Sequence, residues 1–163
     1  MKELDQKILE ILTNDARTPH AQIGEEVGLS RPAVTERVKK LEQSGIIEGY
    51  SAILNPEAVG KSITAFISAK HQGVLNDEVQ VTLNELAKYG EILEIHSIAG
   101  EDCFLIKVRT TDMKSLNRII NHMKQPPLTM VTKTTIVLET YFEKVGGTIL
   151  RESHQPESGG LGF

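Results

Sequence analysis

The chain has 163 residues, which is enough for one domain or two small ones. Its 39% hydrophobic and 25% charged residues are those of an ordinary globular protein, and no apolar run approaches the ~20 residues that a membrane helix needs. The single cysteine excludes an internal disulfide and favours a reducing compartment. The first residues carry acids within their apolar pattern, unlike a secretory signal. We therefore expect a cytoplasmic protein with no membrane partner.

The net charge of −4 argues against a protein that coats nucleic acid through bulk electrostatics, but one segment departs from it. Between Ser30 and Leu41 there are four cationic residues and one acid, Glu36. Such a basic strip is typical of a recognition element, although a solvated helix face gives the same count. The five histidines are scattered, so neither a metal site nor a cofactor is expected.

Three short helices are predicted in the first 45 residues from apolar positions at helical spacing. The first covers residues 4–14. The second follows Thr18 as N-cap, with Pro19 at the first helical position, and ends at Gly28. The third begins after Ser30 as its cap and ends before Gly45. Residues 46–50 then read as a short strand or wing, which completes a (winged) helix-turn-helix domain over residues 1–50.

Residues 51–62 contain Asn55-Pro56 and Gly60 and are predicted to form a linker. The pattern then changes to strand, helix, strand, strand, helix, strand over residues 63–143. The strands are expected at 63–71, 92–99, 103–111 and 131–143, and the first helix at 75–89. Asp112 caps the second helix, whose apolar side is expected to hold Met113, Leu116, Ile120 and Met123. The run Gly100-Glu101-Asp102 signals a tight hairpin.

This βαββαβ order predicts a ferredoxin-like arrangement, with a four-stranded antiparallel sheet covered by both helices on one face. The fold class is therefore α+β. Alternation in residues 103–110 places Phe104 and Ile106 on one face and Cys103 and Leu105 on the other. Apolar residues thus lie on both faces, and a second copy of the sheet is the expected cover for the open one. The glycine-rich tail, residues 144–163, is expected to be flexible and to carry no site.

The helix-turn-helix at residues 22–41 carries the strongest functional signal. Advancing ~100° per residue from Val34 places Val38 and Leu41 inward, and Pro32, Glu36, Lys39 and Lys40 outward. The candidates for base-edge or phosphate contact are Ser30, Arg31 and Thr35. The candidates for phosphate contact are Arg37, Lys39 and Lys40. A three-helix bundle with a merely soluble third helix is the alternative.

The run I-G-E-E-V-G-L-S-R-P-A-V-T-E-R-V-K-K-L-E-Q-S-G-I-I at residues 23–47 resembles the N-terminal module of the leucine-responsive regulatory protein/AsnC (Lrp/AsnC) family of transcriptional regulators. The likeness continues to about residue 143. It implies sequence-specific binding of double-stranded DNA and an ACT-like (RAM) domain at residues 63–143. It also implies sheet-mediated dimers, octamers built from them, and an amino acid or related metabolite as effector.

In that family the effector lies between subunits, near the hairpin that joins the second and third strands. Here Gly100 and Phe104-Leu105 match, whereas Cys103 stands where many members have Asp, so leucine-like specificity is not implied. Glu101 or Asp102 could hold an ammonium group, or could simply solvate the hairpin tip. The candidate effector residues are Ser97, Gly100, Glu101, Asp102, Cys103, Thr132 and Thr134. For Cys103, a small structural residue is favoured over a redox sensor, because flanking acids blunt thiol reactivity.

Two other functions are alternatives to that of a metabolite-responsive regulator. One is an architectural DNA-binding protein without an effector. The other is an enzyme on the same fold that processes tetrapyrroles, as the sirohaem decarboxylases do. Such an enzyme needs basic and histidine residues that converge in the C-terminal domain and has no need of a basic third helix, whereas here Lys and Arg are sparse in the sheet and the third helix is basic. The chain is therefore not expected to be an enzyme.

Overall fold

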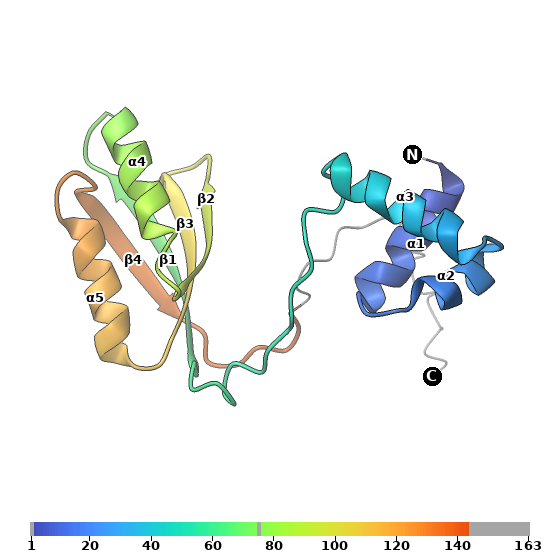
Figure 1. The fold of residues 1–163 in the computed structure, drawn as a ribbon. Helices are drawn as coiled ribbons and strands as arrows, with labels where there is room; N and C mark the ends of the chain where they lie inside the picture. The colour runs from blue at the N-terminus through green and yellow to red at the C-terminus, as the bar shows by residue number, and fades with distance from the viewer. Residues whose placement is uncertain (1, 75, 144–163) are drawn as a thin grey trace, which may run out of the picture. The chain divides into compact units, whose positions relative to one another are not determined.

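The computed structural model describes residues 2–74 and 76–143, in which the chain forms two compact units (Figure 1). The first unit holds three helices and extends to Ile53, and the second runs from Leu54 to Phe142. The elements of the first unit are α1 (Glu3–Asn14), α2 (His20–Val27) and α3 (Arg31–Gln43). Those of the second are β1 (Ile63–His71), α4 (Asp77–Leu86), β2 (Ile92–Ser97), β3 (Phe104–Thr110), α5 (Met113–Lys124) and β4 (Met130–Ile136). The predicted tail, residues 144–163, lies outside the described residues.

The three helices of the first unit pack around one apolar core. Each helix contributes the stripe that its sequence period predicts, and Ile8, Ile23 and Val34 are fully buried. The remaining core residues are Leu9, Leu12, Val38 and Leu41. The predicted inward side of α3 is therefore confirmed, and its other side is left for solvent or a partner.

The turn between α2 and α3 depends on two glycines. Gly28 ends α2 with a φ of 73°, in the left-handed region that favours glycine, as predicted. Gly24 lies one turn earlier, and its carbonyl accepts a hydrogen bond from the Leu29 N–H at 2.9 Å. A Cβ atom on Gly24 would lie 2.4 Å from the Leu29 carbonyl oxygen. The close approach of the Leu29 carbonyl to α2 therefore requires a residue without a side chain at position 24.

Two predicted caps and the wing differ in the structure. Pro19, not Thr18, is the N-cap of α2, because the Thr18 hydroxyl donates to the Asp15 carbonyl at 2.8 Å instead. Ser30 occupies the N-cap position of α3, but its side chain makes no capping hydrogen bond. Residues 46–50 form no strand. The N–H groups of residues 46 and 47 both donate to the Leu41 carbonyl, which wraps the chain back onto the end of α3.

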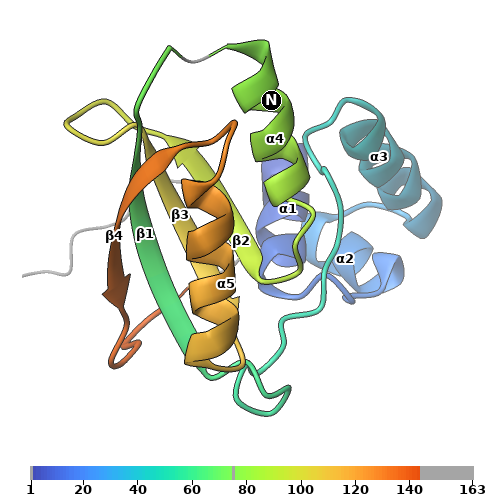
Figure 2. The same cartoon turned by 90° about the vertical axis from the view of Figure 1, so that its left-hand side faces the viewer.

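The second unit is the predicted antiparallel sheet, with strand order β2-β3-β1-β4. Figures 1 and 2 show α4 and α5 on the same face of this sheet. The core between them is built by alternate residues of the central strands, among which Ala65, Ile67, Ile106 and Val108 are fully buried. The α+β ferredoxin-like prediction is confirmed.

The strand register defines what the opposite face of the sheet presents. Phe66 lies opposite Lys107, and Ser68 lies opposite Leu105, all pointing away from the helices. Lys70 pairs with Val131 on the same face. This open face, defined here by Phe66, Leu105, Val131 and the polar residues between them, combines apolar and charged side chains.

Several predicted boundaries are longer than the observed elements. The last strand ends at Ile136 rather than at residue 143, because its partner β1 begins at Ile63 and offers little more to pair with. The hairpin is also wider than predicted: β2 ends at Ser97, β3 begins at Phe104, and the Ile98 N–H donates to the Cys103 carbonyl at 3.0 Å. The predicted tight turn was therefore wrong.

Both helices of the second unit also differ slightly from expectation. Asn76 caps α4 by accepting a hydrogen bond from the Val79 N–H at 3.0 Å, so the helix is shorter than residues 75–89. On α5, Asp112 is the N-cap as predicted. Met113 is 53% exposed and Ile119 is fully buried, so the predicted apolar side was rotated slightly. None of the helices within residues 2–74 and 76–143 is long and apolar enough to cross a membrane.

Candidate nucleic-acid interface

The side of α3 that faces away from the core carries nearly all of the predicted DNA-contacting residues. Seven of the eight are exposed: Ser30, Arg31, Pro32, Thr35, Glu36, Lys39 and Lys40. We refer to these seven as the α3 surface. The short Gly28-Leu29 turn and the core residues of α3 present this surface as one side of a rigid helix.

The N-terminal half of the α3 surface is hydrogen-bonded to α2. The Thr35 hydroxyl donates to the Arg31 carbonyl at 3.0 Å, and His20 Nδ1 lies 2.9 Å from the same hydroxyl oxygen. His20 is half-buried at the first position of α2. It was missed in the sequence because a lone histidine gives no sign of a neighbour 15 residues away. The sequence did indicate the position of His20 in the fold, because Pro19 marks where α2 begins and His20 is the next residue.

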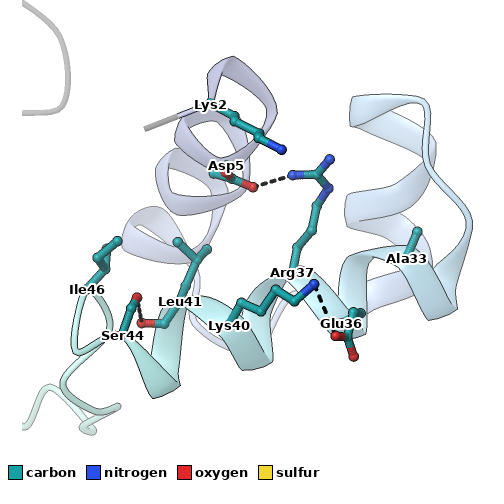
Figure 3. Close-up of a pocket in the computed structure, with 9 residues that line it drawn as sticks. All are labelled: Lys2, Asp5, Ala33, Glu36, Arg37, Lys40, Leu41, Ser44 and Ile46. Carbon is teal, nitrogen blue, oxygen red and sulfur yellow. Dashed lines mark hydrogen bonds and ion pairs between the residues drawn. The ribbon is translucent and has the colours of Figure 1, made fainter.

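The eighth predicted residue, Arg37, has a different environment. Its Nη1 donates to Asp5 Oδ1 of α1 at 2.6 Å, and the side chains of Arg37 and Asp5 are only 27% and 17% exposed. Figure 3 shows the guanidinium turned towards α1, away from the α3 surface. The predicted role in phosphate contact was based on the charge of Arg37 and its position on a flank of the helix, and this geometry gives Arg37 a partner within the protein.

The flank between α1 and α3 forms a shallow hollow of about 530 Å³ (Figure 3). It contains cations and acids from both helices, among them Lys2, Asp5 and Arg37. Lys40 lies at its edge and pairs with Glu36 at 3.3 Å, with both side chains more than half exposed. An exposed pair of this kind contributes little to stability, so Lys40 can exchange Glu36 for a phosphate at little cost.

Tyr50 is bonded to the last turn of α3, where its hydroxyl donates to Glu42 Oε1 at 3.0 Å. Partial burial and the hydrogen bond to the Glu42 carboxylate raise the pKa of Tyr50 to about 12. The phenol therefore stays protonated at any physiological pH, and this bond holds the segment after α3 against the helix.

The candidate effector residues lie near one end of the sheet, and among residues 2–74 and 76–143 only Ser97 of this set lines the hollow beside β2. Ser97 and Phe104 line a hollow of about 340 Å³ between α4 and β2. Cys103, half-buried beside the hairpin, donates its N–H to the Ala69 carbonyl at 2.9 Å. Thr132 is paired with Ala69 on the other side of β1, and Thr134 with Ile67. Gly100 and Glu101 are exposed at the hairpin, with Asp102 partly covered.

Comparisons with known proteins agree with both units. The winged helix-turn-helix DNA-binding family matches residues 1–48, and the Lrp/AsnC ligand binding domain matches residues 64–146. The HTH-type transcriptional regulator FL11 of Pyrococcus horikoshii is 37% identical over 143 residues, which are 88% of this chain and 93% of FL11.

Solved structures are similar over nearly the same extent. The feast or famine regulatory protein of M. tuberculosis complexed with L-methionine superposes with a TM-score of 0.80 at 28% identity, covering 90% of this chain and 97% of that one. A transcriptional regulator of Neisseria meningitidis in complex with L-Met gives 0.76 at 25% identity, covering 91% and 96%. With two family matches along the chain and a relative above 30% identity, the protein belongs to the Lrp/AsnC family of DNA-binding transcriptional regulators, which are not enzymes.

Proposed function

We propose that the protein regulates transcription by placing α3 in the major groove of its operator. The observation that carries this proposal is the α3 surface. It is exposed along one side of the helix, and Val34, Val38 and Leu41 on the other side are buried in the core. An α-helix fits the major groove, and its N-terminal residues approach the base edges. Ser30, Arg31 and Thr35 occupy that end and are proposed to contact bases, with Pro32 and Glu36 beside them.

Phosphate contacts are proposed for Lys39 and Lys40, which extend from the exposed side of α3. Lysine neutralises phosphates and releases counterions, so these contacts add affinity without sequence preference. Arg37 is left out of this set because its guanidinium pairs with Asp5. His20 joins the interface as the support of Thr35.

We further propose the domain organisation and assembly. Residues 1–50 bind DNA, residues 51–62 are a linker, and residues 63–143 sense the ligand and dimerise. The open face supports dimerisation because its apolar members, such as Phe66 and Leu105, are covered by neither α4 nor α5, which both lie on the other face. Two sheets packed face to face present two α3 helices to one operator, and dimers assemble further into octamers. The protein is proposed to work in the cytoplasm.

The proposed effector is an amino acid or a closely related metabolite. Support comes from the Lrp/AsnC ligand binding match and from the two L-methionine complexes among the similar structures. Backbone N–H groups of the hairpin could bind its carboxylate, and Glu101 or Asp102 its ammonium group. The proposed site adds Ser97, Gly100, Cys103, Thr132 and Thr134, and because these are spread along the sheet end, a second subunit would complete it.

Two experiments test this function. Footprinting on the promoter of the protein's own gene tests DNA recognition, and a protein that stays monomeric and ignores duplex at low ionic strength contradicts it. Thermal-shift screening against the twenty amino acids, L-methionine included, tests the effector. A ligand at 100 times its Kd adds ~2.7 kcal/mol to the free energy of unfolding. No shift with any amino acid would favour the architectural, effector-free alternative.

A further inference from the structure

The recognition helix α3 is held on its two flanks by two polar contacts of different kinds. Thr35 meets His20 of α2 on one flank, and Arg37 meets Asp5 of α1 on the other. Between these flanks, Val34, Val38 and Leu41 of α3 pack into the apolar core of the unit. Apolar packing is non-directional, so it resists separation of the helices more than a small rotation of α3 about its own axis. A directional bond on each flank opposes that rotation.

The Asp5–Arg37 pair is the stronger of the two bonds. It is a charge-assisted hydrogen bond of 2.6 Å, and both side chains are mostly buried, which limits screening by salt. Asp5 also lies in the first turn of α1, where a negative charge is favoured by the helix dipole. The partners are 32 residues apart, so the bond joins the first turn of the domain directly to its recognition helix.

We infer that Asp5 and Arg37 are positioning residues, which set the orientation of α3 and so determine DNA affinity and sequence discrimination without touching DNA. The inference rests on the proposed DNA-binding function. It differs from a phosphate contact by Arg37 in a way that can be measured, because the two ideas predict opposite effects of removing the Asp5 charge.

Asp5→Asn provides the decisive measurement. If Arg37 contacted phosphate, removing the neighbouring acid would release a cation and DNA would bind more tightly. If the pair positions α3, Asp5→Asn weakens binding to the operator duplex by roughly tenfold and lowers the ratio of specific to non-specific affinity, because base contacts depend on orientation more than phosphate contacts do. Fluorescence anisotropy with the footprinted operator and a scrambled duplex gives both quantities.

Glu3→Gln is the matched control. Glu3 lies in the same turn of α1 and pairs with Lys7 at 3.1 Å, so the variant removes the same charge without disturbing α3. Its DNA affinity should equal that of the original chain or exceed it slightly. Ile8→Val provides a second control, because it lowers the melting temperature of the same unit without altering a polar contact.

A charge exchange keeps the inference falsifiable even if single variants fold poorly. Arg37→Asp alone should bind weakly, and Asp5→Arg combined with Arg37→Asp should recover most of the affinity and discrimination at an unchanged net charge. The inference is overturned if Asp5→Asn binds as tightly as Glu3→Gln, or if the exchanged pair recovers neither quantity. A failure of the original chain to bind any duplex would instead contradict the proposed function.

Discussion

His20 Nδ1 lies 2.9 Å from Thr35 Oγ1, which joins the first turn of α2 to the exposed side of α3. The direction of this bond follows from simple counting. The Thr35 hydroxyl has one hydrogen, which it donates to the Arg31 carbonyl at 3.0 Å. His20 must therefore donate from Nδ1, so its imidazole holds the hydroxyl oxygen of Thr35 in one orientation.

Replacing His20 with alanine is expected to weaken operator binding roughly fivefold, the effect of about 1 kcal/mol for one hydrogen bond. The loss should fall on sequence discrimination, because the variant releases Thr35 and leaves the lysines of α3 unchanged. Thr35→Val removes the other partner. A double-mutant cycle in the anisotropy assay should show that the two losses are not additive. Strictly additive losses would mean that His20 acts independently of Thr35.

Arg31→Ala and Lys39→Ala are expected to have different effects although each removes one exposed cation from α3. Loss of Arg31 should change sequence preference by ~1–3 kcal/mol at one base pair. Loss of Lys39 should weaken binding to all duplexes alike and reduce the salt slope of log K by about 0.9. Titrations at several salt concentrations with operator and scrambled duplexes separate these outcomes. A uniform loss with Arg31→Ala would contradict its assignment to base contact.

Glu94 predicts how the sheet responds to acid. Hydrogen bonds from His96 at 3.1 Å and from Lys107 at 3.2 Å lower the pKa of the Glu94 carboxyl below its usual 4.5. The folded state therefore binds this proton less readily than the unfolded state does. The stabilisation is present above pH 4.5 and is lost as pH falls through the lowered pKa.

The carboxyl carbon resonance of Glu94 should report this directly. Its NMR titration midpoint is expected below 4.5, and His96→Gln and Lys107→Met should each move it upwards. Because Glu94 is 44% exposed, the effect on stability will be small. Glu94→Gln should make the melting temperature slightly less sensitive to acid. A midpoint in the original chain at or above the ordinary value would mean that these bonds do not persist in solution.

Periodicity predicted the helices and strands well where the sequence of the segment itself determines its structure. The stripes of α1 and α3 and the alternation of β1 required only each segment's own sequence, and Gly28 required only its place after an apolar helix. The end of β4 could not be predicted in this way. Residues 131–143 have strand propensity throughout, but a strand extends only as far as its neighbour, and β1 begins at Ile63.

The candidate functional residues likewise divide into those that the local sequence predicts and those that depend on neighbouring elements. The α3 surface could be predicted because outward positions on a helix follow from its period. Arg37 lies on the flank of that helix, where a cation can face solvent, DNA or another helix, and the sequence does not show that Asp5 lies beside it. The effector candidates came from a resemblance, and the proposed contribution of a second subunit to their site cannot be predicted from residue spacing within one chain.

At Gly24, helix propensity and tertiary contacts predict opposite effects of a substitution on stability. Helix propensity alone predicts that Gly24→Ala stabilises α2 by about 1 kcal/mol. The contact predicts the opposite sign, because the new Cβ would lie 2.4 Å from the Leu29 carbonyl oxygen, and backbone cannot move aside as a flexible side chain can. Overpacking of this kind costs ~1–3 kcal/mol.

We therefore expect Gly24→Ala to lower the melting temperature of the helical unit and to weaken DNA binding, since relief of the clash must open the turn that positions α3. Gly49→Ala is the matched control, because nothing lies within 4 Å of a Cβ at that position. Calorimetry and anisotropy on both variants give the two readouts. If Gly24→Ala were more stable than the original chain and bound the operator equally well, α2 and α3 could separate at the turn without consequence, and the rigid presentation of the α3 surface would be wrong.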